Sequence, residues 1–164
     1  MIETARLRLR PFVIGDAPKL FAMSIEDGMR RWIPDQVYRD DAHAEQVARA
    51  LIGLTDQPPD PRVRPYVLGI EFAGELIGHV GLSPARDSVE IGYAVEQRHQ
   101  GTGLATEAVR AMAAWGRDTL GLAEVLWIVG IENLASRRVL EKAGFVHIRD
   151  GVDGRAQPIA VYKR

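Results

Sequence analysis

The sequence predicts one mixed α/β domain, on three observations. Its 164 residues suit a single domain, large enough to bury roughly two-thirds of the surface that the unfolded chain exposes. Segments with the period of a strand are interspersed with segments that have the period of an amphipathic helix. No internal repeat or low-complexity segment divides the chain. The expected order of elements is β-α-α-β-β-β-α-β-α-β-β.

The first strand and helix follow from the N-terminal pattern. Residues 6–12 alternate charged and apolar side chains, as a half-buried strand does, and Pro11 limits this segment to a short or edge strand. Asp16 is then expected to cap a helix. Its apolar side carries Leu20, Phe21 and Ile25. Residues 31–34, which read Arg-Trp-Ile-Pro, break the helical pattern.

A second amphipathic helix is expected to begin at Asp40 or Asp41. Its apolar stripe consists of Ala44, Val47, Ala48, Leu51 and Ile52, which recur at helical spacing. The proline-rich residues 57–61 follow it. This stretch is too short to link two domains, and we expect an extended surface loop.

Three strands should form the middle of the chain. Residues 66–72 and 76–82 are rich in β-branched and apolar side chains and are joined at 73–75. Turn-forming residues at 83–87 separate them from a third strand at 89–95. Consecutive short strands with such turns predict an antiparallel meander.

The C-terminal part predicts two helices and three strands. A long helix is expected over residues 101–120, with Gly121 placed to terminate it; its apolar positions are Leu104, Ala108, Ala111, Met112 and Trp115. A strand follows at 124–129. A shorter helix begins at Asn133 and ends at Gly144. Its inward-facing side chains are expected to be Leu140 and Ala143. The last strands are expected at 145–149 and 158–162.

Composition excludes several classes of function. A formal net charge of −1 gives no global electrostatic reason to bind nucleic acid or a membrane, although a local basic patch around a phosphate-bearing ligand stays open. The chain has no cysteine, which excludes disulfides, thiolate metal sites and a cysteine nucleophile. His43, His99 and His147 show no metal-ligand spacing with carboxylates, so we expect no metal.

Hydropathy predicts a cytoplasmic location. The first eight residues contain no uninterrupted apolar core of the kind that a signal peptide needs. No stretch approaches the ~20 apolar residues that cross a bilayer.

The segment around residues 90–108 is the most informative for chemistry. A strand ends there, a turn with Gly101 and Gly103 follows, and a helix begins at once. Unpaired amides at a helix N-terminus, together with the helix dipole, form a site for an anion such as a diphosphate, and Arg98 adds a cation nearby. The turn alone also fits a purely structural connection. It is not a Walker A loop, and Thr106 breaks the dinucleotide Gly-x-Gly-x-x-Gly.

Two blocks of sequence resemble the GNAT acetyltransferases. Residues 98–103, Arg-His-Gln-Gly-Thr-Gly, are similar to the family's Gln/Arg-x-x-Gly-x-Gly/Ala signature for the coenzyme A pyrophosphate. Residues 133–145, from Asn-Leu-Ala-Ser to Ala-Gly-Phe, are similar to its Asn-x-x-Ser helix and the following strand. The N-terminal Thr-Ala-Arg-Leu-Arg-Leu-Arg and the segment 31–34 resemble the branch of ribosomal-protein N-terminal acetyltransferases (RimJ/RimL type).

The resemblance implies a GNAT fold over residues 1–164: a mostly antiparallel, twisted sheet of about six or seven strands flanked by about four helices. It implies acetyl-coenzyme A as co-substrate, an amine as acceptor, and a possible homodimer. It assigns coenzyme contacts to Ala94, Val95, Arg98, Gln100, Gly101, Thr102, Gly103, Leu104, Ala105, Asn133 and Ser136. It also places a bulge near Glu96 and Gln97, where the strand would separate from its neighbour. Asn133 and Ser136 equally fit a plain helix N-terminus.

Three residues are candidates for catalysis. Glu90 is the preferred general base, because an amine is mostly protonated at neutral pH and must lose a proton before it attacks. If Leu82 pairs with Val89, His79 falls on the same face as Glu90 and is the rival base. The resemblance suggests that Ser136 protonates the leaving thiolate. Each residue also has an ordinary structural role open to it. Tyr93 and Trp32 are expected mainly to pack, with a catalytic role for Tyr93 and a place in the wall of the acceptor pocket for Trp32 as the alternatives.

Several functions therefore stay open. The first is an amine N-acetyltransferase that acts on a protein N-terminus or on a small amine. The second transfers another acyl group, such as succinyl, from coenzyme A. The third is a coenzyme A-binding regulatory module without catalysis. The fourth is a protein-interaction domain that binds no small ligand, which would require both matched blocks to be accidental.

Overall fold

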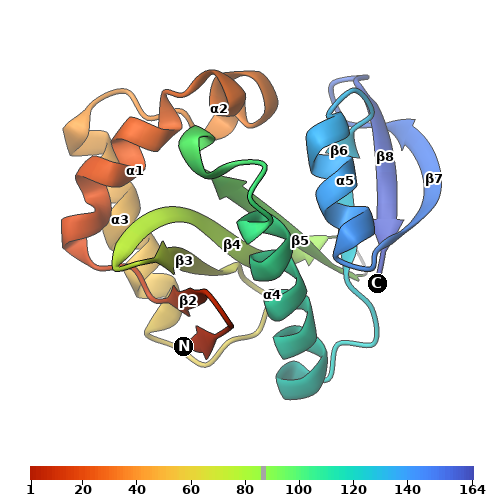
Figure 1. Cartoon of the computed structure of the whole chain (residues 1–164), viewed down its shortest axis with the longest axis horizontal. Coiled ribbons are helices and arrows are strands. Elements are labelled where there is room, and N and C mark those ends of the chain that lie inside the picture. The colour runs from red at the N-terminus through yellow and green to blue at the C-terminus, as the bar shows by residue number, and fades with distance from the viewer. Residues whose placement is uncertain (86–87) are drawn as a thin grey trace.

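The computed structural model describes residues 1–85 and 88–164. It shows an eight-stranded sheet with helices on both faces (Figure 1). The strands are β1 (Ile2–Glu3), β2 (Leu7–Arg10), β3 (Tyr66–Phe72), β4 (Glu75–Ala85), β5 (Ser88–Val95), β6 (Leu126–Gly130), β7 (Val146–Val152) and β8 (Pro158–Lys163). The α-helices in this described part are α1 (Ala17–Ser24), α2 (Asp27–Trp32), α3 (Asp41–Thr55), α4 (Leu104–Leu120) and α5 (Leu134–Lys142).

The sheet is mixed, with the spatial order β1-β2-β3-β4-β5-β6-β8-β7. Among the described strands, β5 and β6 form the parallel pair, and the other neighbours are antiparallel. The mixed α/β class is confirmed. The sheet has one more strand than the seven in the expected order of elements, because β1 pairs with β2 through Ile2 and Glu3 and these two residues show too little pattern to reveal a strand.

The antiparallel meander of β3, β4 and β5 is confirmed. Ala73 and Gly74, both with positive φ (51° and 82°), form the tight turn between β3 and β4, the conformation that suits a two-residue hairpin loop. Strand β4 continues through Ser83 to Ala85, where a turn was expected, so that part of the prediction was wrong. The remaining turn positions, Arg86 and Asp87, lie outside the described residues.

The two faces of this sheet carry different layers. Helix α4 packs against β2, β4 and β5, whereas α1 and α3 pack against β4 and β3. Because successive side chains of a strand alternate between faces, Leu68 and Ile70 join the α4 cluster while Val67 packs with the cluster under α1 and α3. Figure 1 shows α4 in front of the sheet and α1 with α3 to its side.

Two predictions for α1 were wrong in detail. Asp16 occupies the position before α1 without capping it. Its carboxylate instead accepts hydrogen bonds from both terminal nitrogens of Arg10, at 2.8 and 2.9 Å, and from the amide of Val13 at 2.9 Å. Ile25 is exposed, and Met23 is buried beside Leu20, since α1 ends at Ser24.

Helix α2 was not expected, because Arg31 to Pro34 reads as a break. The helix continues into that segment and ends at Trp32. It stops there because Pro34 disfavours a helical conformation of the preceding residue, Ile33. Helix α3 confirms its prediction: the Asp40 side chain accepts a hydrogen bond from the amide of His43 at 2.7 Å, and Ala44 is fully buried.

The C-terminal helices also have their predicted ends. Gly121 (φ 62°) and Gly144 (φ 90°) terminate α4 and α5 in the left-handed region, which glycine enters without a steric penalty. The Asn133 side chain accepts from the amide of Ser136 at 3.1 Å and so caps α5. Helix α4 begins at Leu104 rather than at Gly101, because the glycine turn occupies the intervening residues.

The feature that positions the site is the separation of β5 from β6. Within the described residues, the register between these strands is the single pair Glu90–Leu126. Beyond that pair the strands diverge, so the outer edge of β5 has no neighbouring strand. The bulge expected at Glu96 and Gln97 is absent from the described chain: pairing with β4 runs without a shift to Gly78–Val95, and a 3-10 turn (Gln97–His99) follows.

No helix in the described part of the chain is long and apolar enough to cross a bilayer.

We predict that Gly78→Ala destabilises the protein, because an added Cβ would lie 2.2 Å from the Ala94 carbonyl oxygen, which belongs to the paired backbone of β5. Relief requires movement of a strand, which we expect to lower the free energy of unfolding by about 1–3 kcal/mol, measured by urea denaturation. The matched control is Gly53→Ala, where the added Cβ meets no atom within 4 Å. Alanine favours a helix more than glycine does, so Gly53→Ala on α3 should leave the free energy of unfolding unchanged or raise it by up to about 1 kcal/mol. Equal stability of the two variants would contradict the close approach at Gly78.

Candidate active site

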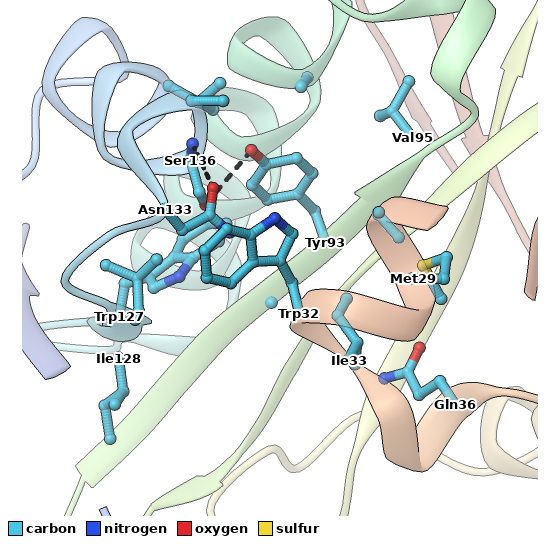
Figure 2. Close-up of a pocket in the computed structure, with 18 of the residues that line it drawn as sticks. Met29, Trp32, Ile33, Gln36, Tyr93, Val95, Trp127, Ile128, Asn133 and Ser136 are labelled. Atoms are coloured by element: carbon cyan, nitrogen blue, oxygen red, sulfur yellow. Dashed lines mark hydrogen bonds between the residues drawn. The ribbon is translucent and has the colours of Figure 1, made fainter. Parts of the chain in front are cut away.

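A cleft of about 1220 Å³ lies where β5 and β6 diverge. It is bounded by the end of β5 with the glycine turn, by β6 with the start of α5, and by α2 with the residues after it. Figure 2 shows Tyr93, Asn133 and Ser136 on one side of it and Met29, Trp32 and Gln36 on another. The cleft is therefore open to both faces of the sheet, through the gap between the two strands.

The glycine turn presents free backbone amides to the cleft. Gly101 (φ 76°) and Gly103 (φ 84°) both adopt the left-handed conformation, which turns the chain from the 3-10 turn into α4. Among the described residues, the amides from Gly101 to Thr106 have no hydrogen-bond acceptor, and the first helical bond runs from Glu107 to Gly103. Free amides at the positive end of a 17-residue helix form an anion site.

The end of β5 lines the same cleft through Ala94 and Val95. Both residues pair with β4 on one edge, and the other edge faces the gap, where an extended ligand can add as a strand. The Gln100 side chain donates a hydrogen bond to the Val95 carbonyl at 3.0 Å. This bond fixes the glycine turn to the end of the strand.

Asn133 and Ser136 face Tyr93 across the gap (Figure 2). The Tyr93 hydroxyl donates to the Ser136 Oγ at 3.4 Å, and the Tyr93 ring packs edge-on against Trp127 at 4.8 Å between centroids. Burial raises the pKa of the Tyr93 hydroxyl, although its bond with Ser136 lowers it. Tyr93 therefore remains protonated at neutral pH and holds a proton beside the cleft.

Glu90 lines the opposite face of the sheet. Its neighbours Val89 and Ile91 belong to the core under α4, so strand alternation directs Glu90 toward the α2 side. Burial raises the pKa of the Glu90 carboxyl above its ordinary value. A half-buried carboxylate with a raised pKa is a stronger base than an exposed one.

His79 also lines the cleft on this face. The register is Leu82–Ile91 rather than Leu82–Val89, two residues from the assumed pairing, and this shift preserves the face. His79 pairs with Ala94, four residues along β5 from Glu90, which places the two roughly 13 Å apart. They make no direct contact. Burial lowers the pKa of His79 to about 4, so the imidazole is neutral at neutral pH.

Two paired glycines lie between these side chains. Gly81 pairs with Gly92, and both line the cleft. A Cβ at Gly92 would meet no protein atom within 4 Å. A Cβ at Gly81 would instead lie 2.8 Å from the Val67 side chain. The bare stretch of sheet is therefore at Gly92, beside Glu90, where a ligand can lie directly on the backbone.

Three residues with expected coenzyme contacts do not line the cleft. The Arg98 guanidinium binds the carboxylates of Glu75 and Glu96. The Thr102 hydroxyl donates to the His99 carbonyl at 2.6 Å. Leu104 is buried in the core under α4, although its amide and that of Thr102 still belong to the glycine turn.

The structure adds functional candidates that the sequence analysis missed. Arg138 and Lys142 line the cleft from α5 and supply the cationic side chains that Arg98 does not. Their i, i+4 spacing on one helix face was the available signal. Trp32 was already a candidate for the wall of the pocket. It lines the cleft, and its ring lies 3.4 Å from the position of a Cβ at Gly130, so it forms a wall instead of packing between two helices.

Within the described residues, no group of three or more acidic or histidine side chains is placed to hold a metal ion.

Known proteins resemble this chain over most of its length. The acetyltransferase (GNAT) domain family matches residues 6–146. Among curated proteins, the "Probable N-acetyltransferase YjcK" of Bacillus subtilis (strain 168) is 41% identical over 151 residues, which cover 88% of this chain and 83% of that protein.

Solved structures show the same fold. An acetyltransferase of the GNAT family from Bacillus anthracis superposes with a TM-score of 0.83 at 20% identity, covering 99% of this chain and 96% of the other. RimL, a ribosomal L7/L12 alpha-N-protein acetyltransferase in complex with coenzyme A, has a TM-score of 0.80 at 17% identity, covering 98% and 94%. At these identities the likeness concerns the fold alone. The family match and the relative together show that this chain belongs to the GNAT acetyltransferases, which use acetyl-coenzyme A.

Proposed function

We propose that this protein transfers an acetyl group from acetyl-coenzyme A to a primary amine by direct attack within a ternary complex. One observation carries the proposal: a continuous cleft joins the free amides of the glycine turn to Glu90 through the gap between β5 and β6. A donor bound at one face of the sheet and an acceptor bound at the other meet in that gap. Residues 1–164 then act as one catalytic domain.

The donor lies along β5. Its pyrophosphate accepts hydrogen bonds from the amides of the glycine turn, and Arg138 and Lys142 add positive charge on the same side. Its pantetheine amides pair with the free edge of β5 at Ala94 and Val95, as an added strand would. Asn133, which already caps α5, borders the same path.

The acceptor approaches from the face of Glu90. Glu90 accepts the proton of the ammonium through a chain of water molecules, because five residues of β5, roughly 16 Å, separate it from Val95. The freed nitrogen attacks the thioester carbonyl carbon, which forms the C–N bond. Backbone amides near Val95 stabilise the oxyanion. Placing both reactants side by side supplies up to ~7–11 kcal/mol in well-oriented systems.

The leaving sulfur departs toward α5. As the C–S bond breaks, the thiolate needs one proton, and Tyr93 with Ser136 holds a hydroxyl pair at that position. The proton passes from Tyr93 or Ser136 to sulfur and is replaced from solvent. The attacking nitrogen loses its second proton to solvent, and Glu90 also releases its proton to solvent, which restores the enzyme. No covalent enzyme intermediate forms, in keeping with a chain that has no cysteine.

Two other functions remain as alternatives to amine acetylation, and we also propose a branch of the family for this chain. Transfer of a larger acyl group such as succinyl requires more room near Tyr93, and a regulatory module would bind coenzyme A without turnover. The raised pKa of Glu90 at the end of an open cleft favours catalysis over regulation. The N-terminal segment and residues 31–34 support kinship with the RimJ/RimL-type branch.

We predict that Gly103→Glu weakens acetyl-coenzyme A binding by at least tenfold, because it adds a negative charge to the turn whose free amides would bind the pyrophosphate and strains a backbone with φ of 84°. Isothermal titration measures the affinity. Gly121→Glu is the matched control, since it puts the same charge and a similar strain (φ 62°) at the other end of α4. Affinity lost equally in both variants would point to general destabilisation instead of pyrophosphate binding.

We predict that Glu90→Gln lowers kcat by about 10²-fold, the usual contribution of a general base. The base acts only when ionised. Since burial raises the pKa of Glu90, wild-type kcat should fall as the pH drops through that raised pKa. Steady-state kinetics from pH 5 to 9 should show this acidic limb in the wild type and its loss in the variant. An unchanged pH profile in Glu90→Gln would mean that another group is the general base. His79→Ala would then be the next variant to measure.

We predict that Gly92→Val blocks the acceptor without harming the fold. An added Cβ at Gly92 meets no protein atom within 4 Å, and the valine side chain extends from it over the bare stretch of sheet beside Glu90. The kcat/KM for the amine should fall at least tenfold, while coenzyme affinity and the unfolding midpoint stay at wild-type values. Gly53→Val, an open position on α3 outside the cleft, serves as the control. Full activity in Gly92→Val would move the acceptor to another surface.

A further inference from the structure

The charged side chains that line the cleft are distributed unequally between its two halves. Arg138 and Lys142 lie on the α5 side with the glycine turn. The half that faces α2, where the acceptor would bind, carries four carboxylates and two arginines: Asp35, Glu90, Glu132, Asp153, Arg31 and Arg155. Glu26 also lines the cleft, but its carboxylate accepts from the amide of Gln97 near the glycine turn. The donor half is thus positive and the acceptor half negative.

Both arginines of the acceptor half are already bound to carboxylates. Arg155 donates to the two oxygens of Asp35, each at 2.8 Å, and Arg31 lies 3.8 Å from Glu132. In the part of the chain that the structure describes, this half keeps no other lining cation. An acceptor with a carboxylate would find no ion-pair partner there.

Two carboxylates of the acceptor half take no part in these ion pairs. Asp153 accepts from the loop amides of Arg155 and Gln157, and Glu90 has no hydrogen-bond partner within the described chain. Their summed charge attracts an ammonium group and repels a carboxylate.

The wall beside these charges is apolar. Figure 2 shows Met29, Trp32, Ile33 and Ile128 around the cleft, and Trp32 and Ile128 remain 36% and 42% exposed. Large apolar side chains that face a cleft instead of the core mark a surface for an apolar ligand. The bare backbone at Gly92 provides room for a flat or unbranched group in the same cleft.

Contacts across the mouth limit the size of the acceptor. The Asp35–Arg155 and Arg31–Glu132 pairs, together with Trp32 against Gly130, join the residues of α2 and its following turn to the C-terminal wall. Exposed ion pairs are individually weak, about 1 kcal/mol or less, so a small molecule can enter as they open. A polypeptide would hold all of them apart while bound.

We propose that the acceptor is a small primary amine with an aromatic or aliphatic body and without a carboxylate, rather than an amino acid or a protein N-terminus. The proposal rests on the acetyl transfer argued above. The ammonium faces Glu90, and the body packs against Trp32.

The test compares acceptors that differ in one group. Tryptamine and tryptophan share the indole and the amine but differ in the carboxylate, and phenethylamine and phenylalanine form a second pair. We expect kcat/KM at least tenfold higher for the amine of each pair. We also expect tryptamine to exceed a tetrapeptide with a free N-terminus and an amidated C-terminus. Equal or faster turnover of the amino acids or of the peptide would overturn the substrate class.

A variant pair tests the charge argument independently. Gln36→Lys adds a cation to the acceptor half, where Gln36 lines the cleft, whereas Gln46→Lys adds the same charge on the outer side of α3. The tryptamine-to-tryptophan ratio should fall at least threefold in Gln36→Lys only. An unchanged ratio in Gln36→Lys, or an equal fall in both variants, would overturn the argument.

A parallel titration with acetyl-coenzyme A separates the two levels of inference. Micromolar binding without turnover of tryptamine or phenethylamine overturns this substrate class and leaves the coenzyme site standing. Absence of binding overturns the proposed function together with it.

Discussion

The divergence of β5 and β6 is the constraint on which the rest of this structure depends. Paired strands satisfy the backbone groups of each other, so a strand edge without a neighbour keeps free donors and acceptors. Here the pairing stops after Glu90–Leu126. The open edge of β5, the cleft, and its passage through the sheet all follow from that one interruption.

An interrupted sheet needs other contacts to hold the end of β5 in place. The Lys19 ammonium binds Glu75 and Glu96 at 2.7 and 2.8 Å, and Arg98 binds the same two carboxylates. Burial tends to raise the pKa of Glu96, but the hydrogen bonds from Lys19 and Arg98 lower it overall. This network connects α1 and β4 to the 3-10 turn that leads into the glycine turn. Arg98 therefore holds the start of the glycine turn in place and does not line the cleft.

The sheet also separates the two proton-transfer roles in the proposed reaction. The period of two in a strand places Glu90 on the face of α2 and Tyr93 on the face of α5. One strand thus supplies both the base for the incoming amine and the proton donor for the outgoing sulfur, from residues three positions apart. Because they lie on opposite faces, the donor does not pass its proton directly to the base. The gap beside β5 is where a thioester would be accessible to both.

The sequence by itself determined the class of the fold, most element types and the glycine turn, because these depend on local patterns: alternation in β3 to β5, helical spacing in α3 and α4, and glycines with positive φ at 101, 103, 121 and 144. It also placed Glu90 and His79 on one face, since a register error of two residues preserves the face. Only the tertiary structure decided the partners of side chains. It directed Arg98 to Glu75 and Glu96, brought Tyr93 to Ser136, set Trp32 against Gly130, and paired Arg155 with Asp35. These contacts join residues as far as 120 positions apart, and no local pattern specifies which distant segments will meet.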